Sequence, residues 1–222
     1  MGSNIKNSMK KVLVVGGTGG LGSQVVKLMS SEYELTSVSS KDLDIRNIEE
    51  CENFFIDKNF DVIINFAGLN YDTFIHKINS DNINKVQNIL EVNINGTINL
   101  VSAALKNMRD NKYGRIILIS SVLSEKNVVG TGVYSSCKSF IDKFVKNVSL
   151  ENIKHGVTAN TIQLGYFDGG MTYKIPEENI ESIKQTIGLQ RFGKIDELVR
   201  TIDFLINNEY VTGINLKIDG NL

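Results

Sequence analysis

Three residues near the middle of the chain could together transfer a proton: Ser121, Tyr134 and Lys138, within the stretch SSVLSEKNVVGTGVYSSCK. Tyr134 and Lys138 are four residues apart, so on a helix their side chains lie on one face. A free tyrosine has a pKa of about 10 and exchanges protons poorly at neutral pH, but a nearby ammonium lowers that pKa. A serine hydroxyl can stabilise the negative charge that develops on a carbonyl oxygen. In isolation, however, a Tyr-x-x-x-Lys sequence more often means a surface tyrosine and a solvated lysine.

Short apolar runs alternate with longer helical patterns, and these elements must position the three residues. We expect strands at residues 11–15, 61–67, 114–121 and 157–164, with weaker ones at 33–38 and 214–219; the expected helices are 21–31, 48–58, 83–108, 134–153 and 196–207. This alternation predicts an α/β fold, a doubly wound parallel sheet of Rossmann type with helices on both faces. The chain of 222 residues has one proline and no repeat or linker. We therefore expect one domain over residues 1–222, with residues 1–9 flexible.

A glycine-rich loop follows the first expected strand and opens the first expected helix. In VVGGTGGLGSQVV, Gly16, Gly20 and Gly22 have the spacing G-x-x-x-G-x-G. A tight turn there needs unusual backbone angles, and a diphosphate can approach closely only where no Cβ intrudes. The helix that follows presents free N–H groups and the positive end of its dipole to an anion. The alternative is a glycine-rich turn without a ligand, but the position between strand and helix favours a dinucleotide site.

Composition disfavours several other classes of protein. The 24 basic and 25 acidic residues give a net charge of -1, so we expect no nucleic-acid partner. No apolar run approaches the roughly 20 residues that cross a membrane, and the N-terminal residues lack a signal-peptide core, so we expect a cytoplasmic protein without membrane contact. Two separate cysteines and two separate histidines predict neither a disulfide framework nor a metal site, and they disfavour a Ser-His-Asp hydrolase.

Six motifs occur in an order that resembles the short-chain dehydrogenase/reductase family. They are the glycine loop, LDIRN with Asp44 and Ile45, NFAG with Asn65, Ala67 and Gly68, VNINGT with Asn93, RIILISSV with Ser121, and YSSCK with Tyr134 and Lys138. The C-terminal stretch LQRFGKIDELVRTIDFLINNEYVTGINLKIDGN is similar to the bacterial 3-oxoacyl-acyl-carrier-protein reductases of that family. Together the motifs span nearly the whole chain. Six motifs in this order therefore indicate the family far more specifically than any single motif does.

The resemblance implies a role for each residue. Tyr134 donates the proton during reduction, Lys138 holds the nicotinamide ribose and tunes Tyr134, Ser121 polarises the carbonyl, and Asn93 positions a water that relays protons. The catalytic residues that we expect are thus Asn93, Ser121, Tyr134 and Lys138. The expected cofactor-binding residues are Gly16, Thr18, Gly19, Gly20, Leu21, Gly22, Ser39, Ser40, Lys41, Asp44, Ile45, Asn65, Ala67, Gly68, Tyr134, Lys138, Gly165 and Phe167.

Two segments depart from the family pattern. After the second strand, SVSSKDLDIRN leads almost directly to the adenine-contacting segment, so the usual intervening helix is absent. Ser39, Ser40 and Lys41 could form a small phosphate site, which favours NADP, whereas Asp42 could instead bind a ribose hydroxyl and favour NAD. After the fifth strand, Leu164-Gly165 replaces Pro-Gly, and Gly169 stands where a threonine that helps to hold the carboxamide is common, with Thr172 as a possible substitute.

These observations favour an NADP-preferring oxidoreductase that transfers a hydride between the nicotinamide and a carbonyl or alcohol substrate. The substrate could be a 3-oxoacyl thioester or another small ketone. A cofactor-binding regulatory or scaffold protein is one alternative, but it has no need of all four catalytic residues. A sugar-nucleotide dehydratase or epimerase is another, but such chains usually carry an added substrate domain. The long helices near residues 83 and 134 resemble those through which family members form homodimers and homotetramers.

Overall fold

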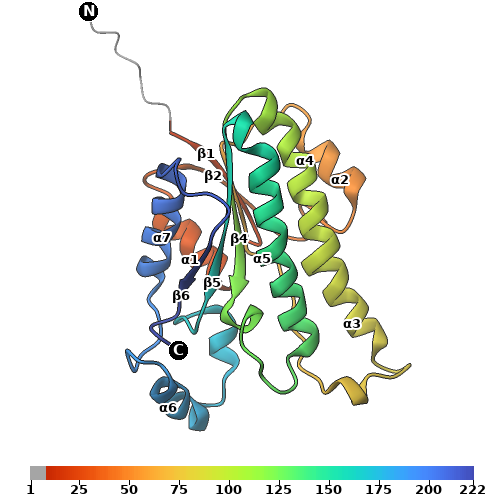
Figure 1. Cartoon of the computed structure of the whole chain (residues 1–222), viewed down its shortest axis with the longest axis vertical. Coiled ribbons are helices and arrows are strands. Elements are labelled where there is room, and N and C mark those ends of the chain that lie inside the picture. The colour runs from red at the N-terminus through yellow and green to blue at the C-terminus, as the bar shows by residue number, and fades with distance from the viewer. Residues whose placement is uncertain (1–8) are drawn as a thin grey trace, which may run out of the picture.

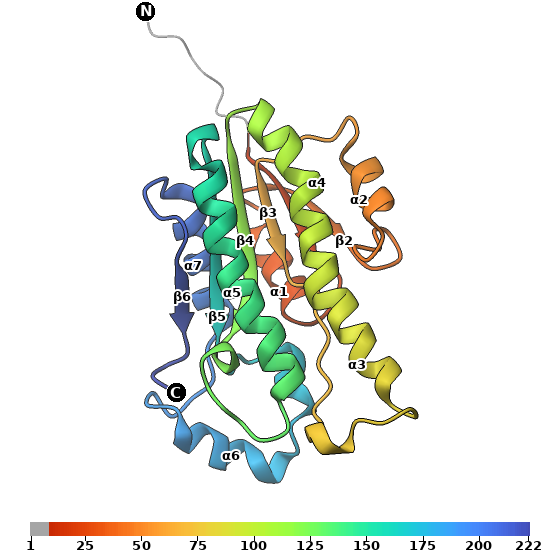
Figure 2. The same ribbon diagram turned by 45° about the vertical axis from the view of Figure 1, so that its right-hand side comes forward.

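The structure is a computed structural model and describes residues 9–222. Six parallel strands form the centre of the molecule. In chain order the strands are β1 (Lys11–Val15), β2 (Glu34–Val38), β3 (Val62–Asn65), β4 (Gly114–Ser121), β5 (Val157–Leu164) and β6 (Asn215–Ile218). The helices are α1 (Gly20–Met29), α2 (Ile48–Phe55), α3 (Ile83–Leu90), α4 (Gly96–Asp110), α5 (Gly132–Asn152), α6 (Glu177–Thr186) and α7 (Ile195–Asn207). Figures 1 and 2 show α1 and α7 on one face of the sheet and α2, α4 and α5 on the other.

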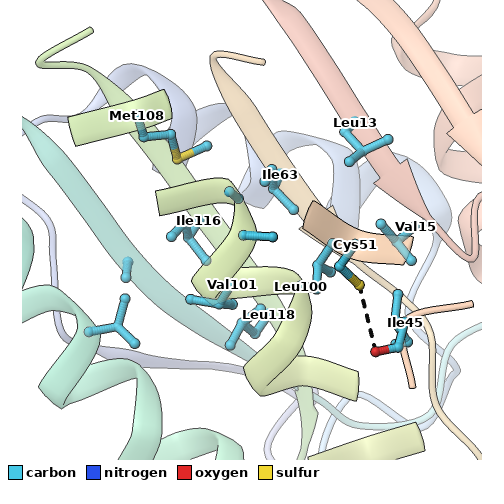
Figure 3. Packing of buried hydrophobic residues seen from close by; sticks show 14 of the residues in the cluster. Leu13, Val15, Ile45, Cys51, Ile63, Leu100, Val101, Met108, Ile116 and Leu118 are labelled. Atoms are coloured by element: carbon cyan, nitrogen blue, oxygen red, sulfur yellow. Dashed lines mark hydrogen bonds between the residues drawn. The ribbon is translucent and has the colours of Figure 1, made fainter. Parts of the chain in front are cut away.

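Successive residues of the strands point to opposite faces and thereby build two apolar layers. On one face Leu13 and Val15 pack with residues of α2, α4 and α5, and Figure 3 shows this layer around Leu100 and Val101. On the other face Val12 and Val14 pack with residues of α1 and α7. Because both faces are covered, β3 and β5 are buried along their whole length.

The order of the strands determines where a ligand can bind. Across the sheet they run β2-β1-β3-β4-β5-β6, so the chain moves outward in one direction from β1 to β2 and in the other from β3 onward. In doubly wound sheets a crevice opens at the carboxyl ends of the strands where the direction changes. The loops after β1, β3 and β4 meet at this edge.

The predicted fold class is confirmed, and each predicted strand is present within two residues at either end. The predicted absence of a helix between β2 and α2 is confirmed as well. The expected helix over residues 83–108 is instead α3, a π-helical segment (Glu91–Asn95) and α4, and α6 is a further helix that follows Pro176. The expected flexible start lies outside the described residues except for Met9. Within residues 9–222, no helix is long and apolar enough to cross a membrane.

Candidate active site

The glycine loop holds its backbone against the neighbouring strand. Gly16 follows β1 with a φ of 75°, and a Cβ there would lie 2.9 Å from the backbone nitrogen of Ala67. A Cβ at Gly22 would collide with the carbonyl oxygen of Gly16, so the first turn of α1 can fold back on the loop only with glycine at that position. No side chain caps the N-terminus of α1, and its first turn carries no acidic residue. The free N–H groups and the helix dipole can therefore attract an anion.

A cleft of about 1300 Å³ extends from this loop across the carboxyl ends of the strands. Ser121, the last residue of β4, and Tyr134 and Lys138 on α5 line one part of it. The side chain of Tyr134 is 6% exposed and that of Lys138 is 5% exposed. The structure thus brings together three of the four predicted catalytic residues on one wall.

The Lys138 ammonium is fixed by its surroundings. Its Nζ donates a hydrogen bond to the carbonyl oxygen of Ile119 at 2.8 Å and lies 5.5 Å from the centre of the Tyr134 ring. A Cβ at Gly68 would be 3.6 Å from the same Nζ, so the loop after β3 also approaches this group. The ammonium is therefore held between β4, the loop after β3 and Tyr134.

Asn93 supports this loop from behind. Its Oδ1 accepts a hydrogen bond from the backbone N–H of Leu69 at 2.8 Å, and its Nδ2 donates one to the Leu69 carbonyl oxygen at 2.9 Å. Asn93 lies in the π-helical segment between α3 and α4, where the wider turn interrupts the regular helix. The Asn93 side chain does not line the cleft, because both ends of its amide bind Leu69. In this structure its amide fixes the loop after β3.

Burial controls the protonation of the pair. Burial raises the pKa of the Tyr134 phenol to about 12, and the nearby Ser121 hydroxyl opposes this only in part. Burial also lowers the pKa of Lys138 to about 8. The expected lowering of the Tyr134 pKa by Lys138 is therefore not found in this structure, where removal of the phenol from water raises that pKa.

The loop after β2 forms the opposite end of the cleft. Ser39 and Ser40 line it, but Lys41 does not. The Asp42 carboxylate accepts hydrogen bonds from the Ser39 hydroxyl at 2.6 Å and the Ser39 backbone N–H at 2.8 Å, and these bonds hold its pKa below the usual value. Asp42 is thus used within the turn. Lys41 does not line the cleft in this structure, and its role at a phosphate site stays a prediction.

Arg46 is the cation that lines this end of the cleft, and sequence reasoning missed it. Its guanidinium forms an ion pair with Asp44, in which Nη2 lies 2.6 Å from Oδ2, and its Nη1 donates to Asn88 at 3.2 Å. The pairing holds the pKa of Asp44 below its usual value. The motif LDIRN contains the signal that could have revealed Arg46, since an arginine two residues after the aspartate can fold back onto it.

The segment after β5 closes over the glycine loop. Gly165, Phe167 and Thr172 line the cleft, and the ring of Phe167 is buried against Gly193. A Cβ at Gly169 would be 2.6 Å from the Gln24 side chain on α1. A larger residue at this position would therefore require the side chains of Gln24 and Leu21 to shift.

Comparison with known proteins identifies the family. A sequence profile described as short chain dehydrogenase matches residues 38–180, more than half of the chain. The chain belongs to the short-chain dehydrogenase family. It is therefore an oxidoreductase, and its relatives are named as reductases.

Two relatives of this short-chain dehydrogenase align over nearly its whole length. The 3-oxoacyl-[acyl-carrier-protein] reductase of Rickettsia felis is 28% identical over 235 residues, which cover 96% of each chain. The acetoacetyl-CoA reductase of a Synechocystis species is 29% identical over 232 residues, which cover 95% of each chain.

Solved structures show the same fold. One described as ElxO with NADP bound has a TM-score of 0.84 and 23% identity, covering 96% of this chain and 98% of that one. A short-chain dehydrogenase/reductase from Burkholderia thailandensis has a TM-score of 0.87 and 20% identity, covering 96% and 92%.

The residues of this short-chain dehydrogenase fit a dinucleotide. A Cβ at Gly19 would have no heavy atom within 4 Å, so the loop borders open space directly before the uncapped N-terminus of α1. The predicted cofactor residues that line the cleft are Gly16, Thr18, Gly19, Gly20, Leu21, Gly22, Ser39, Ser40, Asp44, Ile45, Ala67, Gly68, Tyr134, Lys138, Gly165 and Phe167. Asn65 stands behind the wall, where its Oδ1 accepts a hydrogen bond from the Ala67 backbone N–H at 3.0 Å. Within residues 9–222, no cluster of three or more potential ligands could hold a metal ion.

Proposed function

We propose that this short-chain dehydrogenase is an NADP(H)-preferring reductase that converts the ketone of a 3-oxoacyl thioester to an alcohol. The observation that carries the proposal is the placement of Ser121, Tyr134 and Lys138 on one wall of a cleft that also contains the α1 N-terminus. The relatives named as 3-oxoacyl-[acyl-carrier-protein] reductase and acetoacetyl-CoA reductase support the choice of a thioester.

Bound NADPH would supply the hydride, and the chain would supply protons and stabilise charge. The Ser121 hydroxyl would donate a hydrogen bond to the substrate carbonyl oxygen, and Tyr134 would give its proton to the same oxygen. A phenol whose pKa is raised to about 12 is protonated at neutral pH, as a proton donor must be. Lys138, in its charged form, would stabilise the phenolate that remains. Asn93 would hold the loop after β3 in place for these groups.

The end of the cleft near β2 supports the preference for NADP. Ser39 and Ser40 offer hydroxyl groups, and Arg46 contributes a positive charge there. The Asp42 carboxylate, which could have bound a ribose hydroxyl, is occupied by Ser39. A solved structure with the same fold is described as bound to NADP.

The substitution Tyr134→Phe tests the proposal because it removes the proton donor and keeps the ring. We expect NADPH-dependent reduction of acetoacetyl-CoA to fall by about 100-fold to 10,000-fold. NADPH affinity, measured by fluorescence titration, should stay within a few fold. Tyr113→Phe is the matched control, because Tyr113 lies before β4 with its ring against Arg115. Turnover that survives in Tyr134→Phe would refute the assigned mechanism.

Three further expectations stay predictions within this proposal: a cytoplasmic location, assembly into a homodimer or homotetramer, and one domain over residues 1–222. Light scattering of the purified protein measures the assembly. A monomer at all concentrations would contradict the second expectation.

A further inference from the structure

The cleft has room for a substrate beside the dinucleotide. Its volume of about 1300 Å³ exceeds the roughly 300–1,000 Å³ of most ligand pockets. Beyond Ser121 and Tyr134, the walls come from the loop after β4 and from the segment that includes α6. Figures 1 and 2 show both segments at the end of the molecule toward which the strands point.

Each of these two walls contributes one lysine. Lys126 lies five residues after Ser121, just beyond the short 3₁₀ helix Val122–Ser124, and is half-buried. Lys174 is the last residue of the 3₁₀ helix Gly170–Lys174 and is exposed. Both line the cleft that contains the catalytic residues.

Neither ammonium has an ion-pair partner within residues 9–222, although acidic residues are close in sequence. Glu125, next to Lys126, pairs with Lys217 on β6 at 2.7 Å and accepts a hydrogen bond from Gln163 at 3.0 Å. On α6, Glu181 pairs with Lys184 at 3.9 Å. The acids therefore bind other lysines, and the charges of Lys126 and Lys174 stay available to a molecule in the cleft.

Resting on the proposed function, we infer that Lys126 and Lys174 bind the phosphate of a phosphopantetheine thioester. Thioesters of coenzyme A and of acyl carrier proteins share this chemistry: the acyl group is linked through pantetheine to a phosphate. A lysine binds a phosphate as a compact point charge and needs no fixed orientation. Two lysines from different segments of the same cleft would hold the phosphate while the acyl ketone reaches Ser121 and Tyr134.

Two substrates that differ by one phosphate test the inference: acetoacetyl-phosphopantetheine and acetoacetyl-pantetheine. Each is reduced with NADPH by the wild-type protein, by Lys126→Gln, by Lys174→Gln and by the double variant. We expect KM for the phosphorylated substrate to rise about threefold in each single variant and about tenfold in the double variant, with kcat unchanged. KM for acetoacetyl-pantetheine should not change.

Three controls make the result specific. Lys27→Gln removes the same charge from an exposed position on α1 that does not line the cleft, and it should leave both KM values unchanged. Lys126→Arg with Lys174→Arg should restore most of the affinity because the charges remain. Added salt should raise KM for the phosphorylated substrate more than for the neutral one.

The outcomes separate the inference from the proposed function. Equal KM changes for both substrates, or no change for either, would overturn the role of the lysines while the reductase function stands. If the wild-type protein reduces neither substrate with NADPH, the proposed function fails, and the inference fails with it. The lysine substitutions could instead raise KM for acetoacetyl-CoA and leave KM for acetoacetyl-phosphopantetheine unchanged. That result would assign the lysines to the nucleotide part of coenzyme A and overturn the inference.

Discussion

Tyr134 and Lys138 share one face of α5, as their spacing predicts, but burial changes what that proximity does. The spacing alone suggests a phenol whose pKa is lowered by an ammonium. The structure shows instead a phenol with a pKa raised to about 12 and an ammonium with a pKa lowered to about 8. A sequence reveals which charges are neighbours, but it does not reveal how completely water is excluded from both.

This burial makes a prediction about stability and pH. The pKa of Lys138 is about 8 in the folded protein and 10.5 when the group is exposed, so between these values the unfolded chain binds more protons. Stability due to this residue must therefore rise with pH from about 8 to 10.5. We expect wild-type protein to gain melting temperature relative to Lys138→Met across this window in thermal scans. A difference that is constant with pH would contradict the lowered pKa.

A second prediction for a single residue concerns Arg46. Arg46→Met removes a cation from the cleft and also leaves the Asp44 carboxylate without its partner. The first change removes an attraction for a 2′-phosphate and the second adds a repulsion. NADPH affinity should therefore fall about tenfold or more, while NADH affinity stays within a few fold. Fluorescence titration with each cofactor measures this. Lys27→Met is the matched control, because Lys27 is exposed on α1 and does not line the cleft, and it should change neither affinity. Equal losses for NADPH and NADH in Arg46→Met would refute the assignment.

At the level of elements, neighbouring glycines of the glycine loop have different roles: one permits the packing of α1, and another leaves space for a ligand. Gly22 permits the close contact between α1 and the loop, whereas Gly19 has an ordinary φ of -137° and borders open space. The strand, loop and helix were all predicted from sequence because their periodicity and glycine spacing are local. The π-helical segment at Asn93 was not separated from α3 and α4, because their apolar pattern continues through it.

Gly19→Ala should therefore separate binding from folding. The added methyl meets no heavy atom within 4 Å, so the melting temperature should stay nearly unchanged. The same methyl occupies space in front of the α1 N-terminus, so NADPH affinity should fall about tenfold or more. Gly22→Ala is the contrasting variant and should lower stability because of its contact with Gly16. Unchanged NADPH affinity in Gly19→Ala would remove the loop from the cofactor site.

At the level of the whole molecule, the sequence predicted the parallel sheet because β3, β4 and β5 are apolar runs separated by helical patterns. It did not reveal Arg46 as a lining residue of the cleft, since the position of Arg46 depends on how the loop after β2 turns through Ser39 and Asp42. The position of α6 beside the cleft was equally hard to predict, because none of its residues is buried and Ile180 and Ile183 form only a narrow apolar stripe.

The two apolar layers should dominate stability. Leu100 on α4 is fully buried between the helix and the sheet. Leu100→Ala should cost about 2–5 kcal/mol of unfolding free energy in urea denaturation, because it leaves a cavity that the neighbours cannot fill. Leu150 on α5 is 78% exposed, and Leu150→Ala should change the free energy by less than about 0.5 kcal/mol. Similar losses in both variants would contradict the assigned core.

The most direct test of the central claim is turnover of acetoacetyl-CoA by the wild-type protein with NADPH and, separately, with NADH. The proposed function predicts oxidation of one NADPH for each 3-hydroxybutyryl-CoA formed, with a higher kcat/KM for NADPH than for NADH. Tight binding of NADPH without any reduction of the thioester would contradict it and would favour a cofactor-binding role without catalysis.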